Sequence, residues 1–196
     1  MILAFDTSAA YVAAALCDGR SIVATRHEYM ARGQAERLLP LLEELLAEAG
    51  IGWPDLDAIG VGIGPGNFTG IRISVAAARG LALSLGIPAI GVNAFDAMQP
   101  DLARAVCPAV PGPRKGAYLR DAKTGDIRLA PVEEMLDLMQ DVALATPDPT
   151  ALPHQIARVA AARLATGQPQ PRPAPLYVRP ADAAPSSDQP PALLDD

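Results

Sequence analysis

The chain has 196 residues, of which 50% are hydrophobic and 19% are charged, and its formal net charge is −6. This length and composition allow a sizeable core, as one large domain or two small ones. The acidic balance argues against an extended electrostatic footprint for RNA or DNA.

The first half of the chain alternates strand and helix patterns, and three strands precede the first helix. A dinucleotide-binding domain would instead begin strand-helix-strand. The patterns predict strands at Ile2–Phe5, Tyr11–Leu16, Ser21–Glu28, Ala58–Ile63 and Ile87–Val92, and helices at Gln34–Ala49, Ile71–Leu85 and Phe95–Ala105.

The first predicted helix has an unusually broad apolar side. Its leucines recur at helical spacing, and Leu39 and Leu46 widen the stripe beyond what packing on one sheet needs. Pro40 lies inside the pattern, so its first turn is either separate or kinked. Two interpretations stay open for this helix, a core helix with a generous apolar side or an association surface.

A glycine-rich stretch, Gly64 to Gly70, joins a predicted strand to the next helix. Its glycines allow positive φ and close backbone approach, and Thr69 or Asn67 can cap the helix. The turn therefore suits an anion or a closely packed neighbour. It is not a Walker motif, because Ile71 stands where that motif needs a lysine. The helix that follows has little side-chain bulk, so a partner helix could approach it closely.

The second half repeats a similar order of elements in a reduced form, without sequence repetition. We expect strands at Val106–Val110, Ala117–Arg120, Ile127–Ala130 and Val142–Ala145, and helices at Val132–Met139 and Leu152–Leu164. Eight prolines follow Gly167, which predicts a mostly disordered tail unless Leu176 to Arg179 orders. The expected organisation is an N-terminal lobe over 1–105, a reduced C-terminal lobe over 106–167 and a proline-rich tail over 168–196.

Few residues carry chemistry. Asp6 ends a strand, where it could reach a metal-bound phosphate or serve as an ordinary turn residue. His27 and His154 are isolated, the two cysteines have no C-x-x-C spacing, and no G-x-S-x-G nucleophile motif occurs. We therefore expect no metal site and no catalytic residues, and nothing supports a peptidase.

The N-terminus lacks the basic region of a signal peptide, because an early acid, Asp6, follows a short apolar run. No uncharged apolar run reaches the roughly 18 residues of a membrane helix. The sequence thus predicts a soluble cytoplasmic protein with no membrane partner.

Four segments resemble the bacterial TsaB (YeaZ) family in the order expected of it. They are Met1 to Ser8, Gln34 to Pro40, Gly64-Pro65-Gly66-Asn67-Phe68-Thr69-Gly70-Ile71-Arg72, and Tyr177-Val178-Arg179. The resemblance is good from residue 1 to about 105 and patchy beyond. It implies an α/β fold of the actin/hexokinase/Hsp70 (ASKHA) type, with two lobes of which the second is shortened.

The resemblance also implies a role in making N6-threonylcarbamoyladenosine at position 37 of tRNA. Members of the family are non-catalytic subunits that pair with and activate a catalytic paralogue, TsaD, and a TsaE-type ATPase joins them. The chain alone would then bind no cofactor, ATP and a metal ion would belong to the wider complex, and tRNA would be contacted indirectly. A homodimer is expected where the partner is missing.

In the family the first two helices form the pairing surface. The residues that this implies are Leu38, Leu41, Leu42, Leu45, Ile71, Val75, Ala78 and Ala82. We therefore expect Leu45→Glu or Ala78→Trp to abolish pairing while the chain stays folded.

A possible nucleotide or anion contact would comprise Asp6, Thr7, Gly64, Gly66, Asn67, Thr69 and Arg72. The alternative function that these residues leave open is an ATP-binding enzyme like a sugar or acyl kinase, with Asp6 near Mg²⁺ and the glycine stretch at phosphate.

Two positions depart from the family pattern. Gln34 stands where the family usually has histidine, so any role of that histidine is absent. Gly112-Pro113-Arg114-Lys115-Gly116 replaces a D-A-R-x-G-E segment and lacks its acid.

Overall fold

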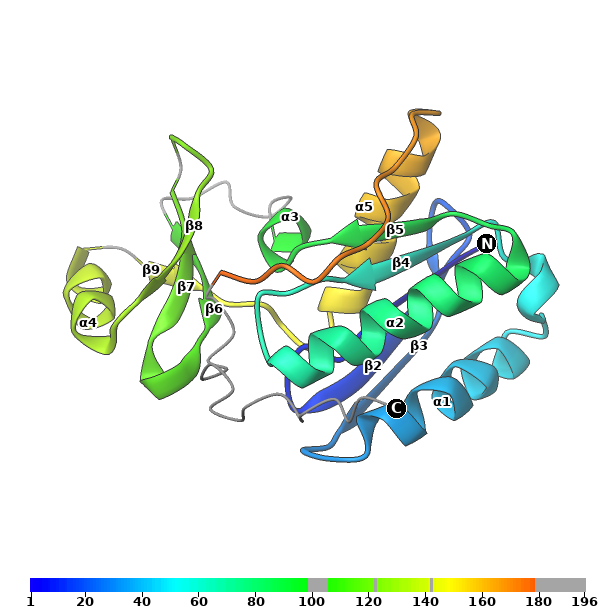
Figure 1. The fold of residues 1–196 in the computed structure, drawn as a ribbon, viewed down its shortest axis with the longest axis horizontal. Helices are drawn as coiled ribbons and strands as arrows, with labels where there is room; N and C mark the ends of the chain where they lie inside the picture. The colour runs from blue at the N-terminus through cyan, green and yellow to red at the C-terminus, as the bar shows by residue number, and fades with distance from the viewer. Residues whose placement is uncertain (99–105, 122, 142, 179–196) are drawn as a thin grey trace, which may run out of the picture.

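The computed structural model describes residues 1–98, 106–121, 123–141 and 143–178, which form two sheets with helices packed on them (Figure 1). In chain order the elements are β1 (Ile2–Asp6), β2 (Tyr11–Cys17), β3 (Ile22–Tyr29), α1 (Gln34–Glu48), β4 (Ala58–Gly62), α2 (Phe68–Leu85), β5 (Ala89–Val92), α3 (Ala94–Met98), β6 (Val106–Pro111), β7 (Ala117–Arg120), β8 (Ile127–Ala130), α4 (Val132–Asp141), β9 (Ala143–Ala145) and α5 (Leu152–Ala165).

The predicted elements therefore lie where the patterns placed them, to within a few residues. The helix predicted at Phe95–Ala105 begins at Ala94 and is described to Met98, and 99–105 lie outside the described residues. Pro40 does not divide the first helix, because α1 continues through it from Gln34 to Glu48.

The first sheet has the strand order β3-β2-β1-β4-β5. Neighbouring strands are antiparallel from β3 to β1 and parallel from β1 to β5. Alternate residues of β1 point to opposite sides, so Leu3 and Phe5 face α1 and α2 while Ile2 and Ala4 face α5. The sheet is thus covered by helices on both of its faces.

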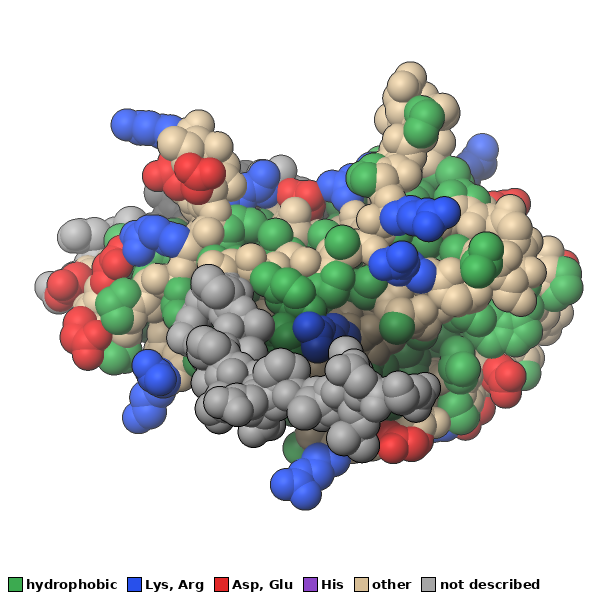
Figure 2. Space-filling view, viewed as in Figure 1, with side chains coloured by type: hydrophobic (Ala, Val, Ile, Leu, Met, Phe, Trp, Pro, Cys, Tyr) green, Lys and Arg blue, Asp and Glu red, His purple; other side chains and the backbone are tan. Residues whose placement is uncertain are grey.

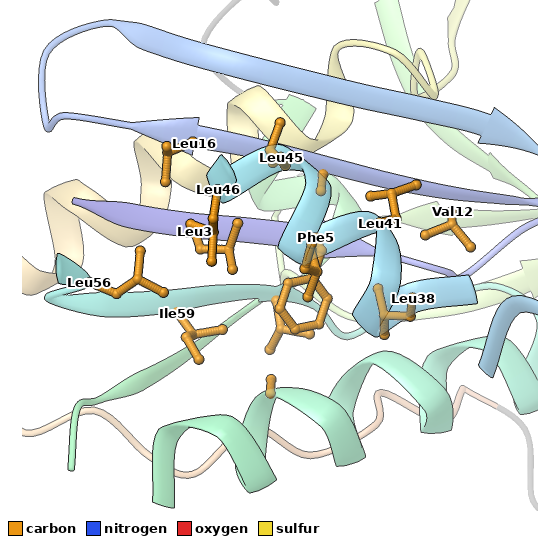
Figure 3. Packing of buried hydrophobic residues seen from close by; sticks show 14 of the residues in the cluster. Leu3, Phe5, Val12, Leu16, Leu38, Leu41, Leu45, Leu46, Leu56 and Ile59 are labelled. Atoms are coloured by element: carbon orange, nitrogen blue, oxygen red, sulfur yellow. The ribbon is translucent and has the colours of Figure 1, made fainter. Parts of the chain in front are cut away.

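The leucine stripe of α1 points into the core (Figure 3). Leu38, Leu41, Leu42 and Leu45 are each at most 1% exposed and lie among Leu3, Phe5 and the apolar side chains of α2. Burying each of these leucines contributes about 2 kcal/mol. Leu46 is buried as well, whereas Leu39 is 45% exposed. Apart from Leu39 the stripe is therefore a core surface, the first of the two interpretations that the sequence left open.

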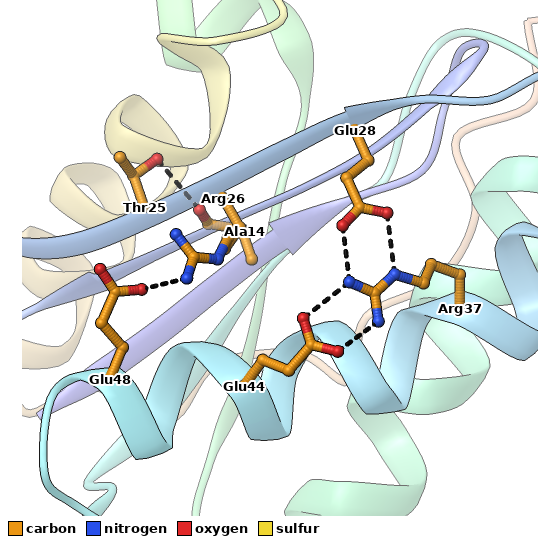
Figure 4. A network of polar contacts seen from close by, with 7 residues as sticks. All are labelled: Ala14, Thr25, Arg26, Glu28, Arg37, Glu44 and Glu48. Carbon is orange, nitrogen blue, oxygen red and sulfur yellow. Dashed lines mark hydrogen bonds and ion pairs between the residues drawn. The ribbon is translucent and has the colours of Figure 1, made fainter.

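Ion pairs on the outer side hold α1 to strand β3 (Figure 4). Arg37 Nη2 lies 2.6 Å from Glu28 Oε1, and Arg37 Nη1 lies 2.6 Å from Glu44 Oε1. Arg26, two residues before Glu28 on β3, forms an ion pair with Glu48 of α1. The guanidinium of Arg37 lowers the pKa of both Glu28 and Glu44.

The helix α5 packs on the first sheet, although its sequence lies within the segment 106–167 that we assigned to the second lobe. Ala157 and Ala160 of α5 pack against the small residues of β1, β2 and β4. Gly60 makes this approach possible, because a Cβ added there would lie 3.1 Å from Ala160 Cβ. The order of elements could not reveal this crossing back to the first lobe.

The second sheet has the order β8-β7-β6-β9 and packs against α4 on one side, through Ala109, Leu119 and Met135. Its other side meets α3, where Val110 and Tyr118 contact Ala94 and Phe95. Asp96 of α3 adds a polar link there. Its carboxylate accepts from Arg120 Nη1 at 2.8 Å and from Arg163 Nη2 at 2.6 Å, which joins β7 to α5.

Within the described residues, α2 is the one helix long and apolar enough to meet the criteria for a membrane span. Its inner side is buried on the sheet through Ile71, Val75 and Ala78, and it carries Arg72 and Arg79. We therefore assign α2 as a core helix.

Candidate functional site

The carboxylate of Asp6 is enclosed at the end of β1. Its Oδ2 accepts three hydrogen bonds, from the Ser8 backbone amide at 3.0 Å, the Ser8 hydroxyl at 2.7 Å and the Tyr11 hydroxyl at 2.6 Å. Its Oδ1 has no hydrogen-bond partner in the described part of the chain, and lies where a side chain on Gly62 would be. The residue is only 1% exposed.

Burial raises the pKa of Asp6, more than the hydrogen bonds from Tyr11 and Ser8 lower it. The same burial, together with the neighbouring carboxylate, raises the pKa of Tyr11. A carboxyl group enclosed in this way is poorly placed to meet a metal-bound phosphate. Sequence reasoning singled out Asp6 but missed Tyr11, because a tyrosine that begins a strand reads as an ordinary core residue.

The glycine loop, which we define as Gly64 to Gly70, lies directly against the turn that follows β1. A Cβ on Gly70 would lie 1.9 Å from the carbonyl oxygen of Thr7, and one on Gly66 would lie 2.4 Å from that of Ser8. Gly64 also has a positive φ of 93°, and its bond to Pro65 is cis. The glycines therefore serve close backbone packing, one of the two uses that the sequence allowed.

Several polar groups of the glycine loop are engaged within the protein. The Asn67 amide donates to Ser8 O at 2.6 Å, and the Asn67 side chain caps α2 by accepting from the Gly70 amide at 2.8 Å. The Thr7 hydroxyl donates to Gly70 O at 2.6 Å. Of the two predicted caps, Asn67 and not Thr69 takes this role. The expected anion contact thus has its Asp6, Thr7 and Gly64 parts buried.

Of the four remaining members of the expected anion contact, Asn67, Thr69 and Arg72 are exposed and Gly66 is half-buried. Arg72 lies with its guanidinium carbon 3.8 Å from the centre of the Phe68 ring, and its Nε donates to the Tyr177 hydroxyl at 2.7 Å. The Tyr177 ring stacks on Phe68 with their centres 5.0 Å apart. We call these three residues, Phe68, Arg72 and Tyr177, the clamp.

Most residues of the expected partner interface do not reach the surface. Seven of the eight, from Leu38 to Ala78, are at most 3% exposed, and Ala82 is half-buried. Leu45 and Ala78 are both fully buried, so Leu45→Glu and Ala78→Trp would disrupt the core and could not test pairing. The expectation that these two variants stay folded is therefore wrong.

The side of α2 that faces solvent is formed by other residues. Arg72, Ala76, Gly80 and Leu83 follow one another at helical spacing and are all exposed, and Leu83 is 85% exposed. We call these four residues the outer face of α2. Figure 2 views the molecule from the side drawn in Figure 1, where Lys and Arg side chains lie over the middle of the face and most Asp and Glu side chains lie toward its edges.

The two positions that depart from the family pattern have local structural roles. The Gln34 side-chain amide donates to Ala9 O at 2.5 Å and to Tyr11 O at 3.0 Å, and so ties the start of α1 to the start of β2. In the Gly112–Gly116 turn, Arg114 and Lys115 adopt left-handed φ values of 54° and 63° and lie exposed.

The two histidines lie on the side of the sheet that α5 covers. His27 packs between Tyr11 and Tyr29, and His154 Nε2 lies 3.1 Å from Thr25 Oγ1. Among the described residues, no three His, Cys, Asp or Glu side chains are grouped so as to hold a metal ion.

Comparison with protein families gives a match that covers most of the chain. The family model of TsaD, described as tRNA N6-adenosine threonylcarbamoyltransferase, matches residues 23–175. TsaB of Escherichia coli K12, described as a tRNA threonylcarbamoyladenosine biosynthesis protein, is 37% identical over 97 residues. That alignment covers 50% of this chain and 42% of the E. coli protein, so the match spans less than half of that relative's length.

Two solved structures from Pseudomonas aeruginosa share the fold. One, described as an uncharacterized protein with similarity to peptidase YeaZ, has a TM-score of 0.66 and 26% identity, covering 91% of this chain and 99% of that one. The other, described as YeaZ, has a TM-score of 0.61 and 27% identity, covering 83% of this chain and 92% of that one. These similarities and the two sheets confirm the predicted two-lobed α/β fold of the ASKHA type.

The contact between the glycine loop and β1 predicts opposite effects for two alanine substitutions on α2. Gly70→Ala should lower the free energy of unfolding by more than about 3 kcal/mol, because its Cβ meets the Thr7 backbone. Gly80→Ala has open space among the described residues and should raise it by up to about 1 kcal/mol. Urea denaturation measures both, and equal stability of the two variants would contradict the packing role.

The raised pKa of Asp6 predicts a change in how stability depends on pH. The folded state holds the proton of Asp6 more tightly than the unfolded chain does. The contribution of protonated Asp6 to the free energy of unfolding is therefore largest at low pH. It is lost as the pH rises from the ordinary value of 3.8 through the folded pKa. Asp6→Asn should therefore lose less stability than the wild type between pH 4 and pH 8, as measured by urea denaturation.

The matched control for this pH series is Asp137→Asn on the exposed side of α4. It should keep the pH dependence of the wild type. Identical pH dependence in the wild type and Asp6→Asn would show that Asp6 ionises as it does in the unfolded chain.

Proposed function

We propose that this chain, which belongs to the tRNA N6-adenosine threonylcarbamoyltransferase (TsaD) family and within it to the TsaB/YeaZ group, is a non-catalytic subunit of a larger complex. That complex makes N6-threonylcarbamoyladenosine at position 37 of tRNA. In this role the chain pairs with a TsaD-like catalytic paralogue in the cytoplasm and activates it. The similarity of its sequence to E. coli TsaB, which is described as a tRNA threonylcarbamoyladenosine biosynthesis protein, supports the proposal.

The enclosure of Asp6 is the observation that carries the non-catalytic part of the proposal. The carboxylate at the end of β1 is the group that a kinase-like enzyme of this fold would need near a metal-bound phosphate, and here it is buried against Tyr11 and Ser8. The amides of Asn67 and Gly70 in the glycine loop are likewise bonded within the protein. ATP, the metal ion and the transfer chemistry then belong to the TsaD-like paralogue and a TsaE-like ATPase, which also bring the tRNA.

The outer face of α2 is the pairing surface that we propose. Ala76 and Gly80 have little bulk, so a partner helix can approach the α2 backbone closely, and Leu83 offers an exposed apolar side chain one turn further on. Covering an exposed leucine of this kind with a partner removes its apolar surface from water and so stabilises the complex. The partner is the TsaD-like paralogue, and a second copy of this chain occupies the same surface when the paralogue is missing.

Reconstitution of the tRNA modification tests the proposed function directly. Omitting this chain from a mixture of the TsaD-like paralogue, the TsaE-like ATPase, the other pathway enzymes and tRNA should abolish or strongly reduce the modified adenosine, measured by mass spectrometry of tRNA digests. Asp6→Asn, which keeps the shape of the side chain, should support modification at close to the wild-type rate. Modification that proceeds equally well without the chain would overturn the proposal. A folded Asp6→Asn that pairs normally but is inactive would favour the kinase-like alternative.

A charge on the outer face of α2 should prevent pairing. Leu83→Glu places a carboxylate at a position that is 85% exposed, so the chain should fold normally while its affinity for the TsaD-like paralogue falls at least tenfold. The control is Leu136→Glu, at a 58% exposed leucine on α4 of the second lobe, which should bind like the wild type. Calorimetry with the purified paralogue measures both, and undiminished binding by Leu83→Glu would place the pairing surface elsewhere.

A further inference from the structure

The segment after α5 returns across the molecule as an ordered strap, which we define as residues 168–178. Figure 1 shows it in orange, running beside β5 and toward the second sheet. Prolines stand at every second position from Pro169 to Pro175, and each restricts its own φ and removes a backbone donor. The strap therefore runs extended beside β5 at a small entropic cost.

Contacts fix the strap to the first lobe at three successive places. Pro173 is buried against Gly91, where a Cβ would lie 3.5 Å from the proline ring. Leu176 follows the last of these prolines, and its amide donates to Ile63 O at 2.8 Å, just beyond the end of β4. Tyr177 then stacks on Phe68 and accepts the hydrogen bond from Arg72.

The next residue contacts the second lobe. Val178 packs against the cluster of Ala94, Phe95, Val110 and Tyr118, which joins α3 to the second sheet. Adjacent residues of one chain thus contact the start of α2 and the junction between the lobes. A single peptide unit therefore separates these two contacts.

The clamp also lies at one end of the outer face of α2. Arg72 is both the clamp residue held by Tyr177 and the first member of the series Arg72, Ala76, Gly80 and Leu83. Phe68 and Tyr177 are 40% and 44% exposed, so a partner that docks on this face can contact their rings. Aromatic residues are enriched at protein interfaces, and a tyrosine adds a hydroxyl group to its apolar ring.

We propose that the strap is an intramolecular latch that completes the pairing surface: it holds the first turn of α2 in place and contributes the Tyr177 ring to the docking site for the TsaD-like paralogue. The pairing part of this inference rests on the proposed function. The latch part concerns the isolated chain alone and can be tested without any partner.

Hydrogen exchange of the isolated full-length chain tests the latch. In Tyr177→Ala, exchange of the Gly70 and Ile71 amides, which are bonded to Asn67 at the start of α2, should rise about tenfold, because a stacked ring pair and a hydrogen bond are lost together. Tyr177→Phe keeps the ring and should show a smaller rise. Gln168→Ala, at an exposed position near the start of the strap, should exchange like the wild type. Unchanged exchange in Tyr177→Ala would overturn the latch whether or not the chain pairs.

Calorimetry of the same variants with the purified TsaD-like paralogue tests the pairing part. Tyr177→Ala should weaken binding about tenfold while Gln168→Ala binds like the wild type. If exchange rises in Tyr177→Ala but binding stays at the wild-type level, the strap is not part of the pairing surface. If the wild-type chain does not bind the paralogue at all, the proposed function fails, and the exchange experiment still decides the latch.

Discussion

The carbonyl groups of Thr7 and Ser8 lie so close to Gly70 and Gly66 that neither glycine has room for a side chain. This contact fixes the start of α2 against the end of β1, and the Asn67 cap and the Thr7 hydroxyl reinforce it through three short hydrogen bonds. The direction in which α2 leaves the sheet follows from it. So does the division of α2 into a side buried in the core and a side that faces solvent.

The carboxyl group of Asp6 lies one residue before this contact. Ser8, Tyr11 and Gly62 enclose it, and its burial raises the pKa of the carboxyl group. Burying a carboxylate is costly unless all its oxygens are bonded, and Oδ1 has no partner among the described residues. A buried acid in this state suits a structural position better than phosphate chemistry, which agrees with the proposed role as an accessory subunit.

On α1 and α2, the residues that fill the core therefore differ from the residues that face solvent. Most leucines of α1, together with Ile71 and Val75 of α2, fill the core. To solvent α2 presents Phe68 and Arg72 at its start, followed by the small residues Ala76 and Gly80 and by Leu83. The strap extends that surface with Tyr177 and links it to the junction of the lobes through Val178. Pairing and lobe arrangement would then be coupled through the strap.

The amino-acid sequence by itself determined the type and approximate bounds of nearly every described element, because strand and helix periods are local properties of the chain. It also identified the glycine loop, and its resemblance to the TsaB family identified the fold. Only the tertiary structure decided which partner each surface has. The resemblance to the family assigned Leu45 and Ala78 to the pairing surface, but both are buried in a core that includes strand residues distant in the sequence. In the same way, the sequence did not predict that α5 packs on the first sheet or that Tyr177 of the proline-rich segment accepts a hydrogen bond from Arg72. Contacts between distant segments depend on the path of the whole chain and leave no periodic signal in either segment.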